Sequence, residues 1–210
     1  PPLDKPRVKR SDYRSAGEYF EALCEKEQGD YVLDRRDNVD GIAQLRLPMP
    51  KYVPDSLGSY SAESAGTSYL AVHQNPSGHL VPKAARLYMF MEIVTSFSDQ
   101  GDLRTFSRYS RDERSLTALR IELATQLTAR YGYLWRGTPQ FDWREEGIIG
   151  GELLLIEIST KRLLGMRRIF FRDDVNLSVS DRVDRSSGKR CPGIKNEGLH
   201  FIVDVLKPQN

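Results

Sequence analysis

Residues 111–131, RDERSLTALRIELATQLTARY, are the stretch on which the predicted fold class depends. Apolar side chains recur in it every three or four residues, the spacing of one face of an α-helix. The residues on this face are Leu116, Leu119, Leu123, Leu127 and Tyr131. Ser110 and Glu113 have the spacing of a capping box, and Gly132 is a C-terminal helix signal. The pattern predicts one long amphipathic helix over 111–131, packed against a sheet.

Apolar runs on both sides of this helix predict the strands of that sheet. Residues 86–97 are apolar on both faces, as in a strand at the middle of a sheet, and residues 152–158 are another strongly apolar strand candidate. Residues 68–73, 167–171 and 199–206 are further strand candidates. Because the order is not a regular β-α-β alternation, we expect an α+β fold with a largely antiparallel sheet.

The N-terminal part predicts a short helix after an extended arm. Residues 1–14 are basic and rich in proline, which favours an arm rather than a packed element. Ser15 and Glu18 have capping-box spacing, and the apolar residues that follow predict an amphipathic helix over 16–28. Residues 30–66 contain several prolines and are predicted to be mostly loop. We therefore expect an arm over 1–14 and a single α+β domain over 15–210.

Composition limits the class of protein. The chain has 210 residues, of which 39% are hydrophobic and 29% charged, and its net charge is +2. No apolar run approaches the ~18 residues of a membrane-spanning helix, and no signal-peptide pattern is present. Cys24 and Cys191 are far apart, so the sequence indicates neither a disulfide framework nor a zinc site. We expect an intracellular location, cytoplasmic or nuclear, or a place within a virion.

Arginine is the dominant base, and it occurs in groups. Clustered arginine is typical of a surface that binds phosphate, although such groups are also found on solvated faces balanced by acids. The groups nearest to predicted strands and to the start of the long helix are the candidates for phosphate contacts. These candidates are Arg104, Arg108, Arg162, Arg167 and Arg168.

Aromatic residues crowd the segment just after the predicted helix. Tyr133, Trp135 and Arg136 could stack on unpaired bases, seal a hydrophobic corner, or form a protein interface. The string Tyr133-Leu134-Trp135-Arg136 resembles a segment of the RNA-binding backbone subunits of CRISPR surveillance complexes. A basic, proline-rich arm before a compact body is similar to some viral coat or matrix proteins. Neither likeness assigns a family.

Catalytic motifs do not emerge from the sequence. Phosphate-binding glycine loops and the serine nucleophile elbow are missing. Glu157 with Asp142 or Asp173 could hold a divalent ion for phosphodiester cleavage, but the lysine expected two positions after Glu157 is replaced by Ser159. Glu92 and Asp204 are single carboxylates in apolar runs, like Glu157, and could form a cluster only if all three face one way.

The leading hypothesis is a non-enzymatic structural or assembly protein without cofactor or metal. It associates with nucleic acid, RNA favoured, through its arginines, and it self-associates or joins a larger complex. The alternatives are a metal-dependent phosphodiester-cleaving enzyme and a pure protein-interaction subunit, such as a viral matrix-type protein.

Overall fold

The computed structural model describes residues 8–45, 72–74, 80–82, 86–97, 103–111, 118–137, 147–172, 189–191 and 198–209. The helical elements in these residues are η1 (Arg10–Asp12), α1 (Ala16–Lys26) and α3 (Gly198–Val205). The strands are β1 (Gly29–Val32), β2 (Arg36–Val39), β3 (Gly41–Gln44), β4 (Val72–Gln74), β5 (Leu80–Pro82), β6 (Phe90–Phe97), β7 (Leu103–Arg111), β8 (Leu119–Ala124), β9 (Tyr131–Gly137), β10 (Ile148–Glu157), β11 (Arg162–Arg172), β12 (Lys189–Arg190) and β13 (Leu206–Pro208).

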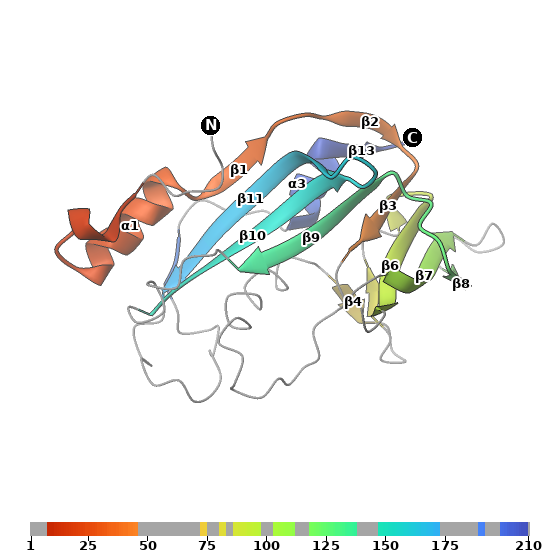
Figure 1. The fold of residues 1–210 in the computed structure, drawn as a ribbon, viewed down its shortest axis with the longest axis horizontal. Helices are drawn as coiled ribbons and strands as arrows, with labels where there is room; N and C mark the ends of the chain where they lie inside the picture. Colours follow the sequence, from red (N-terminus) through yellow and green to blue (C-terminus); the bar gives the residue numbers. More distant parts are fainter. Residues whose placement is uncertain are drawn as a thin grey trace.

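Most of the described strands belong to one mixed sheet (Figure 1). Its nine strands include a continuous order β1-β11-β10-β9-β3-β6-β7-β8, and β12 pairs with β11 beside this path. β3 is parallel to both β6 and β9, and the other pairs are antiparallel. Two small additional sheets pair β13 with β2 and β4 with β5.

The predicted fold class is wrong, because residues 111–131 do not form a long helix. β7 ends at Arg111, β8 covers Leu119–Ala124, and β9 begins at Tyr131. The helical spacing of the leucines coincides with a second pattern, in which Leu119, Ile121 and Leu123 alternate with Arg120 and Glu122. Alternation with period two is the pattern of a strand, and pairing of β8 with β7 decides between the two. The fold is therefore mostly strands, with two short α-helices in the described residues.

The C-terminal apolar run is also assigned differently in the structure. Residues 199–206 were predicted to be a strand, but α3 occupies Gly198–Val205 and only Leu206 belongs to β13. Phe201, Ile202 and Val205 are buried in the main core with residues of β9, β10 and β11. A Cβ on Gly165 of β11 would lie 3.1 Å from the Phe201 ring and 3.2 Å from Val205, so glycine lets this helix approach the sheet.

Several short strands lie where a loop was expected. β1, β2 and β3 fall within residues 29–44, so that part of the loop prediction over 30–66 is wrong. Residues 46–66, and residues 68–71 of the predicted strand 68–73, lie outside the described residues.

The other predicted strands are present with shifted ends: β6 within 86–97, β10 over 152–157, and β11 over 167–171. The turn between β10 and β11 lies at 158–161.

The predicted N-terminal helix is confirmed. Ser15 Oγ accepts a hydrogen bond of 3.2 Å from the Glu18 amide, and Glu18 Oε2 accepts one of 3.0 Å from the Arg14 amide. These bonds satisfy amides of the first turn, as the capping-box spacing indicates. Tyr19, Phe20 and Leu23 are buried in a second core cluster. Val8, within the predicted arm, is also buried in this cluster, and residues 1–7 of the arm lie outside the described residues.

Cys24 of α1 and Cys191 after β12 form a disulfide, which the sequence did not indicate. Their Cα atoms are 5.2 Å apart although 167 positions separate them in the chain. Packing of α1 on Ile148 and Phe170 brings the two thiols together, so the pairing depends on the tertiary fold. Figure 1 shows α1 beyond one end of the sheet. The disulfide links this helix covalently to the residue that follows β12.

We expect the double substitution Cys24→Ala and Cys191→Ala to lower the free energy of unfolding by about 2–4 kcal/mol, because a disulfide restricts the unfolded chain. Urea unfolding with and without a reductant measures this. Wild-type protein should lose stability on reduction, and the double variant should not respond. Equal stability of oxidised wild type and double variant would contradict the assignment.

Candidate anion-binding site

Three strand ends and one connection meet at the turn between β10 and β11. The register pairs Glu157 of β10 with both Tyr131 of β9 and Arg162 of β11, so the three strands end at the same level. β1 pairs with β11 up to Val32, and the amides of Leu33 and Asp34 then donate to the Leu164 carbonyl at 2.9 and 3.0 Å. The chain therefore carries residues 34–36 past the β10–β11 turn.

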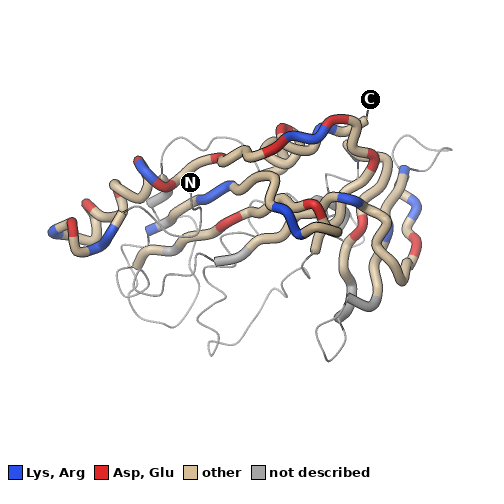
Figure 2. The backbone as a smooth tube through the Cα atoms, turned by 45° about the horizontal axis from the view of Figure 1, so that its top comes forward, with Lys and Arg blue, Asp and Glu red and all other residues tan. Residues whose placement is uncertain are grey.

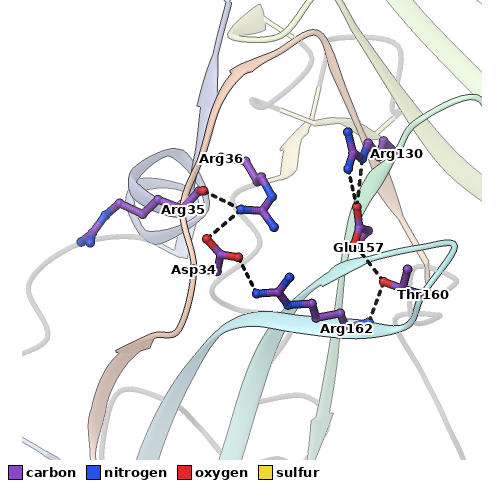
Figure 3. Close-up of polar contacts among 7 residues, drawn as sticks. All are labelled: Asp34, Arg35, Arg36, Arg130, Glu157, Thr160 and Arg162. Atoms are coloured by element: carbon purple, nitrogen blue, oxygen red, sulfur yellow. Dashed lines mark hydrogen bonds and ion pairs between the residues drawn. The ribbon is translucent and has the colours of Figure 1, made fainter.

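Two carboxylates form ion pairs with the arginines beside the β10–β11 turn (Figure 3). Glu157 Oε1 accepts from Arg130 Nε at 2.9 Å and from Nη2 at 2.7 Å, and its Oε2 accepts from Thr160 Oγ1 at 2.9 Å. Asp34 forms ion pairs of 2.7 Å with Arg36 through one oxygen and with Arg162 through the other. Three guanidinium groups are thus fixed beside one another by two acids.

We call Arg36, Arg130, Lys161 and Arg162, together with Asp34 and Glu157, the arginine cluster. Four bases against two carboxylates leave it two positive charges. The side chains of Arg130 and Arg162 are 67% and 58% exposed, whereas that of Glu157 is 9% exposed. Arg130 and Arg162 therefore face solvent and Glu157 lies beneath them, whereas Arg36 and Asp34 are both half-buried. Arg35 points away from the cluster and pairs with Asp204 at 3.1 Å (Figure 3).

The electrostatic field of the cluster lowers the pKa of both acids. The hydrogen bond from Arg130 is the main reason that the pKa of Glu157 falls below its ordinary value, with Thr160 adding to it. The hydrogen bond from Arg36 is the main reason that the pKa of Asp34 is lowered. In return, the pKa values of Arg130 and Arg36 are raised. Both carboxylates therefore stay ionised at neutral pH and hold the guanidinium groups in place.

This arrangement is chemically suited to binding an oxyanion. A guanidinium has five N–H donors in a fixed plane, and one carboxylate occupies only some of them. The remaining donors of Arg130 and Arg162, with the exposed Lys161 between the strands, face solvent at the end of the sheet. Phosphate and carboxylate are the ligands that such donors recognise in pairs.

Among the residues predicted to contact nucleic acid, Arg162 belongs to the cluster and Arg108 lies elsewhere. The Arg108 guanidinium is 3.9 Å from the centre of the Phe90 ring and donates to Thr128 Oγ1 at 3.0 Å. The backbones of Arg104 and Arg136 are in β7 and β9, but their side chains lie outside the described atoms. The sequence therefore pointed to one of the three arginines of the cluster.

The other predicted residues are buried. Arg167 and Arg168 are 3% and 5% exposed, and Tyr133 and Trp135 lie in the main core. Arg167 forms two bonds of 2.6 Å to Asp30. In this fold the two aromatic side chains seal a hydrophobic region, one of the roles considered for them, and their faces are not accessible for base stacking.

Arg168 forms a buried ionic triad with two carboxylates. Its Nε and Nη2 lie 2.8 and 2.7 Å from Glu152 Oε1, and its Nη1 lies 3.2 Å from Glu27 Oε2. Glu27 and Glu152 are 2% and 1% exposed. The strand register puts Arg168 directly opposite Glu152. Its role here is to join α1, β10 and β11.

The three single carboxylates do not form a metal site. Glu92 is buried and accepts bonds of 2.9 to 3.1 Å from the amides of Thr128 and Ala129. Glu157 and Asp204 have the arginine partners given above. No group of three His, Cys, Asp or Glu side chains suited to a metal occurs in the described part of the chain. Asp142 and Asp173, the predicted partners of Glu157, lie outside that part.

Arg36 and Arg130 were missed by the sequence analysis. A signal was present, because Asp34-Arg35-Arg36-Asp37 alternates acids and bases in a segment that was interpreted as loop. Figure 2 shows that bases are interspersed with acids over the described elements, so the cluster is a local excess rather than a charged face.

Comparisons with known proteins give no further assignment. No protein-family model, no curated protein and no solved structure matches this chain. Neither helix of the described residues is long and apolar enough to cross a membrane.

Replacing Arg168 by Met should lower the free energy of unfolding by about 3–5 kcal/mol, because two buried carboxylates then each lose an ion pair. The matched control is Arg162→Met at the exposed Asp34 ion pair, which should cost less than ~1 kcal/mol. Urea unfolding of both variants measures the difference, and equal losses would show that burial of the triad is not what stabilises this region.

The ion pair of Glu157 should make the cluster sensitive to acid. Because the pKa of Glu157 is lower in the folded than in the unfolded state, its contribution is present above the ordinary carboxyl pKa, about 4.3. It is lost as the pH falls through the lowered folded value. The chemical shift of the Glu157 side-chain carbon against pH should show a higher midpoint in Arg130→Gln than in wild type. Identical midpoints would contradict the assigned cause.

Proposed function

We propose that this chain is a non-enzymatic, nucleic-acid-associated assembly protein that binds backbone phosphates through the arginine cluster. The observation that carries the proposal is the pair of exposed guanidinium groups, Arg130 and Arg162, held over inner carboxylates with Lys161 between the strands. Their fixed positions lower the entropy cost of binding, and their free donors match phosphate oxygens.

RNA is the ligand to test first, as the sequence analysis favoured it. The binding mode is electrostatic, since the accessible groups are cations and the aromatic side chains of β9 that are described here are buried. Phosphate contacts of this kind carry little sequence information, so we expect affinity to depend on salt more than on base sequence.

The disulfide indicates the redox environment in which such a protein functions. Disulfides persist in oxidising settings, including virions and extracellular spaces, and are rare in a reducing cytoplasm. Of the locations expected from the sequence, Cys24–Cys191 therefore favours a virion over the cytoplasm or nucleus.

The enzymatic alternative receives no support from the geometry of Glu157. Both of its carboxylate oxygens accept hydrogen bonds, one from Arg130 and the other from Thr160. A guanidinium at this distance competes directly with a divalent cation for the carboxylate. The contacts of Glu157 thus support a role in positioning arginine.

The test is the binding of a labelled single-stranded RNA, followed by fluorescence anisotropy over a series of salt concentrations. The variant Arg130→Gln/Lys161→Gln/Arg162→Gln removes the exposed bases of the cluster. If these three groups contact phosphates, the slope of log affinity against log salt should become less negative by about 2, at roughly 0.7 per contact.

A matched control removes the same charge elsewhere. Lys26→Gln/Arg35→Gln/Lys207→Gln changes three exposed bases outside the cluster. We expect it to bind almost as wild type does. If both triple variants lose affinity equally, only net charge matters and the cluster is not the site; if neither loses affinity, the proposal is overturned.

A further inference from the structure

β8 leaves one edge of the main sheet open in the described part of the chain. It is the last strand of the order, it pairs with β7 on one side, and none of the described strands pairs with its other side. Its apolar side chains are unusually accessible, since Ile121 is 54% exposed and Leu123 is 81% exposed. An open, apolar edge strand is a template for pairing with another strand.

The sequence of β8 is complementary to itself. In an antiparallel pair of copies with Ile121 opposite Ile121, Leu119 stands opposite Leu123 and Arg120 stands opposite Glu122. Each β8 then contributes to two ion pairs and three apolar contacts across the pair. Opposite charges and apolar side chains that face one another directly are the pairs that stabilise antiparallel strands.

Neighbouring registers lack this match. A shift that puts Arg120 opposite Arg120 brings like charges together, and a shift that puts Glu122 opposite Glu122 does the same. Shifts that pair Ile121 with Arg120 or Glu122 place the apolar face of one copy beside the charged face of the other. The charges on β8 therefore select the register centred on Ile121.

The charges of β7 extend the same pattern. Arg108 of β7 is opposite Glu122 of β8, and Arg120 and Glu122 form an ion pair of 2.5 Å within the strand. Across the paired copies, each Glu122 would lie between Arg108 of its own chain and Arg120 of the other. On the opposite face Tyr109 is beside Ile121, so the apolar surface also continues from one sheet into the next.

We propose that β8 is a homodimerisation edge, which pairs antiparallel with β8 of a second copy about a two-fold axis at Ile121. The contact is isologous, and it joins the two main sheets into one continuous sheet. A six-residue strand pair is small for a protein interface, so the dimer is expected to dissociate on dilution. This surface differs from the arginine cluster, and the inference does not rest on the proposed function.

The first experiment measures mass by sedimentation velocity over a range of protein concentrations, with no nucleic acid present. Wild type should shift from monomer to dimer as concentration rises. Ile121→Lys should remain monomeric, because two lysines would meet on the axis. A wild type that is monomeric throughout, or an Ile121→Lys variant that dimerises as wild type does, overturns the proposal.

Charge reversal tests the register itself. Arg120→Glu alone puts Glu opposite Glu122 twice, and Glu122→Arg alone puts Arg opposite Arg120 twice, so each variant should dimerise more weakly. Mixing the two restores both ion pairs, so a heterodimer should form although neither variant pairs well with itself. Arg35→Glu, an exposed reversal away from β8, is the control and should dimerise as wild type does. If the mixture stays monomeric, this register is wrong.

Discussion

The guanidinium of Arg168, buried between the carboxylates of Glu27 and Glu152, is the interaction on which the arrangement of this fold depends. A buried cation is tolerated only when its partners are in place, because leaving it unpaired costs several kcal/mol. Glu152 is supplied by β10 and Glu27 by the end of α1, so the triad requires the hairpin and the helix together. The helix position in turn brings Cys24 beside Cys191.

Arg167, the residue before Arg168, makes its contacts on the opposite face of β11. Side chains alternate along β11, so Arg167 points to the face that carries α3, and its guanidinium is 5.2 Å from the centre of the Phe201 ring. Arg167 also holds Asp30 of β1. Two consecutive arginines therefore fix a neighbouring strand and a helix on each side of β11. Arg167 and Arg168 are thus buried residues that hold the packing together, whereas Arg130 and Arg162 are exposed at the surface.

Local patterns predicted the parts of the fold that local interactions determine. The capping residues Ser15 and Glu18 marked the start of α1, and the apolar run in 152–158 marked β10, because both signals act within a few residues. Residues 111–131 could not be assigned this way, since leucine spacing fits a helix while the alternation around Ile121 fits a strand. Pairing with β7, a non-local interaction, decides the outcome. The prediction for 199–206 was wrong in the other direction, with a strand expected where a helix forms. The buried residues of this run have helical spacing, but apolar residues are so frequent in it that the run was interpreted as a strand.

The candidate site was harder to predict than the fold for the same physical reason. Arg36, Arg130 and Arg162 lie in three separate parts of the sequence. They meet because Glu157 is opposite both Tyr131 and Arg162 in the sheet, and because β1 pairs with β11 and carries residues 34–36 past the turn. Counting arginines along the chain finds dense groups, but it does not distinguish a buried partner of Glu152 from an exposed base. Register and burial make that distinction, and neither can be read from one sequence without its strand pairing.

If the arginine cluster binds phosphate and β8 pairs with a second copy, as we propose, each contact is weak and the two would reinforce one another. A dimer joined at β8 carries two copies of the cluster, so one nucleic-acid strand can bind both and the second contact becomes intramolecular. By linkage, a strand that bridges two chains also raises the local concentration of their β8 edges and favours their pairing. A modest phosphate affinity and a small strand interface can thus give an assembly that forms on nucleic acid and dissociates without it.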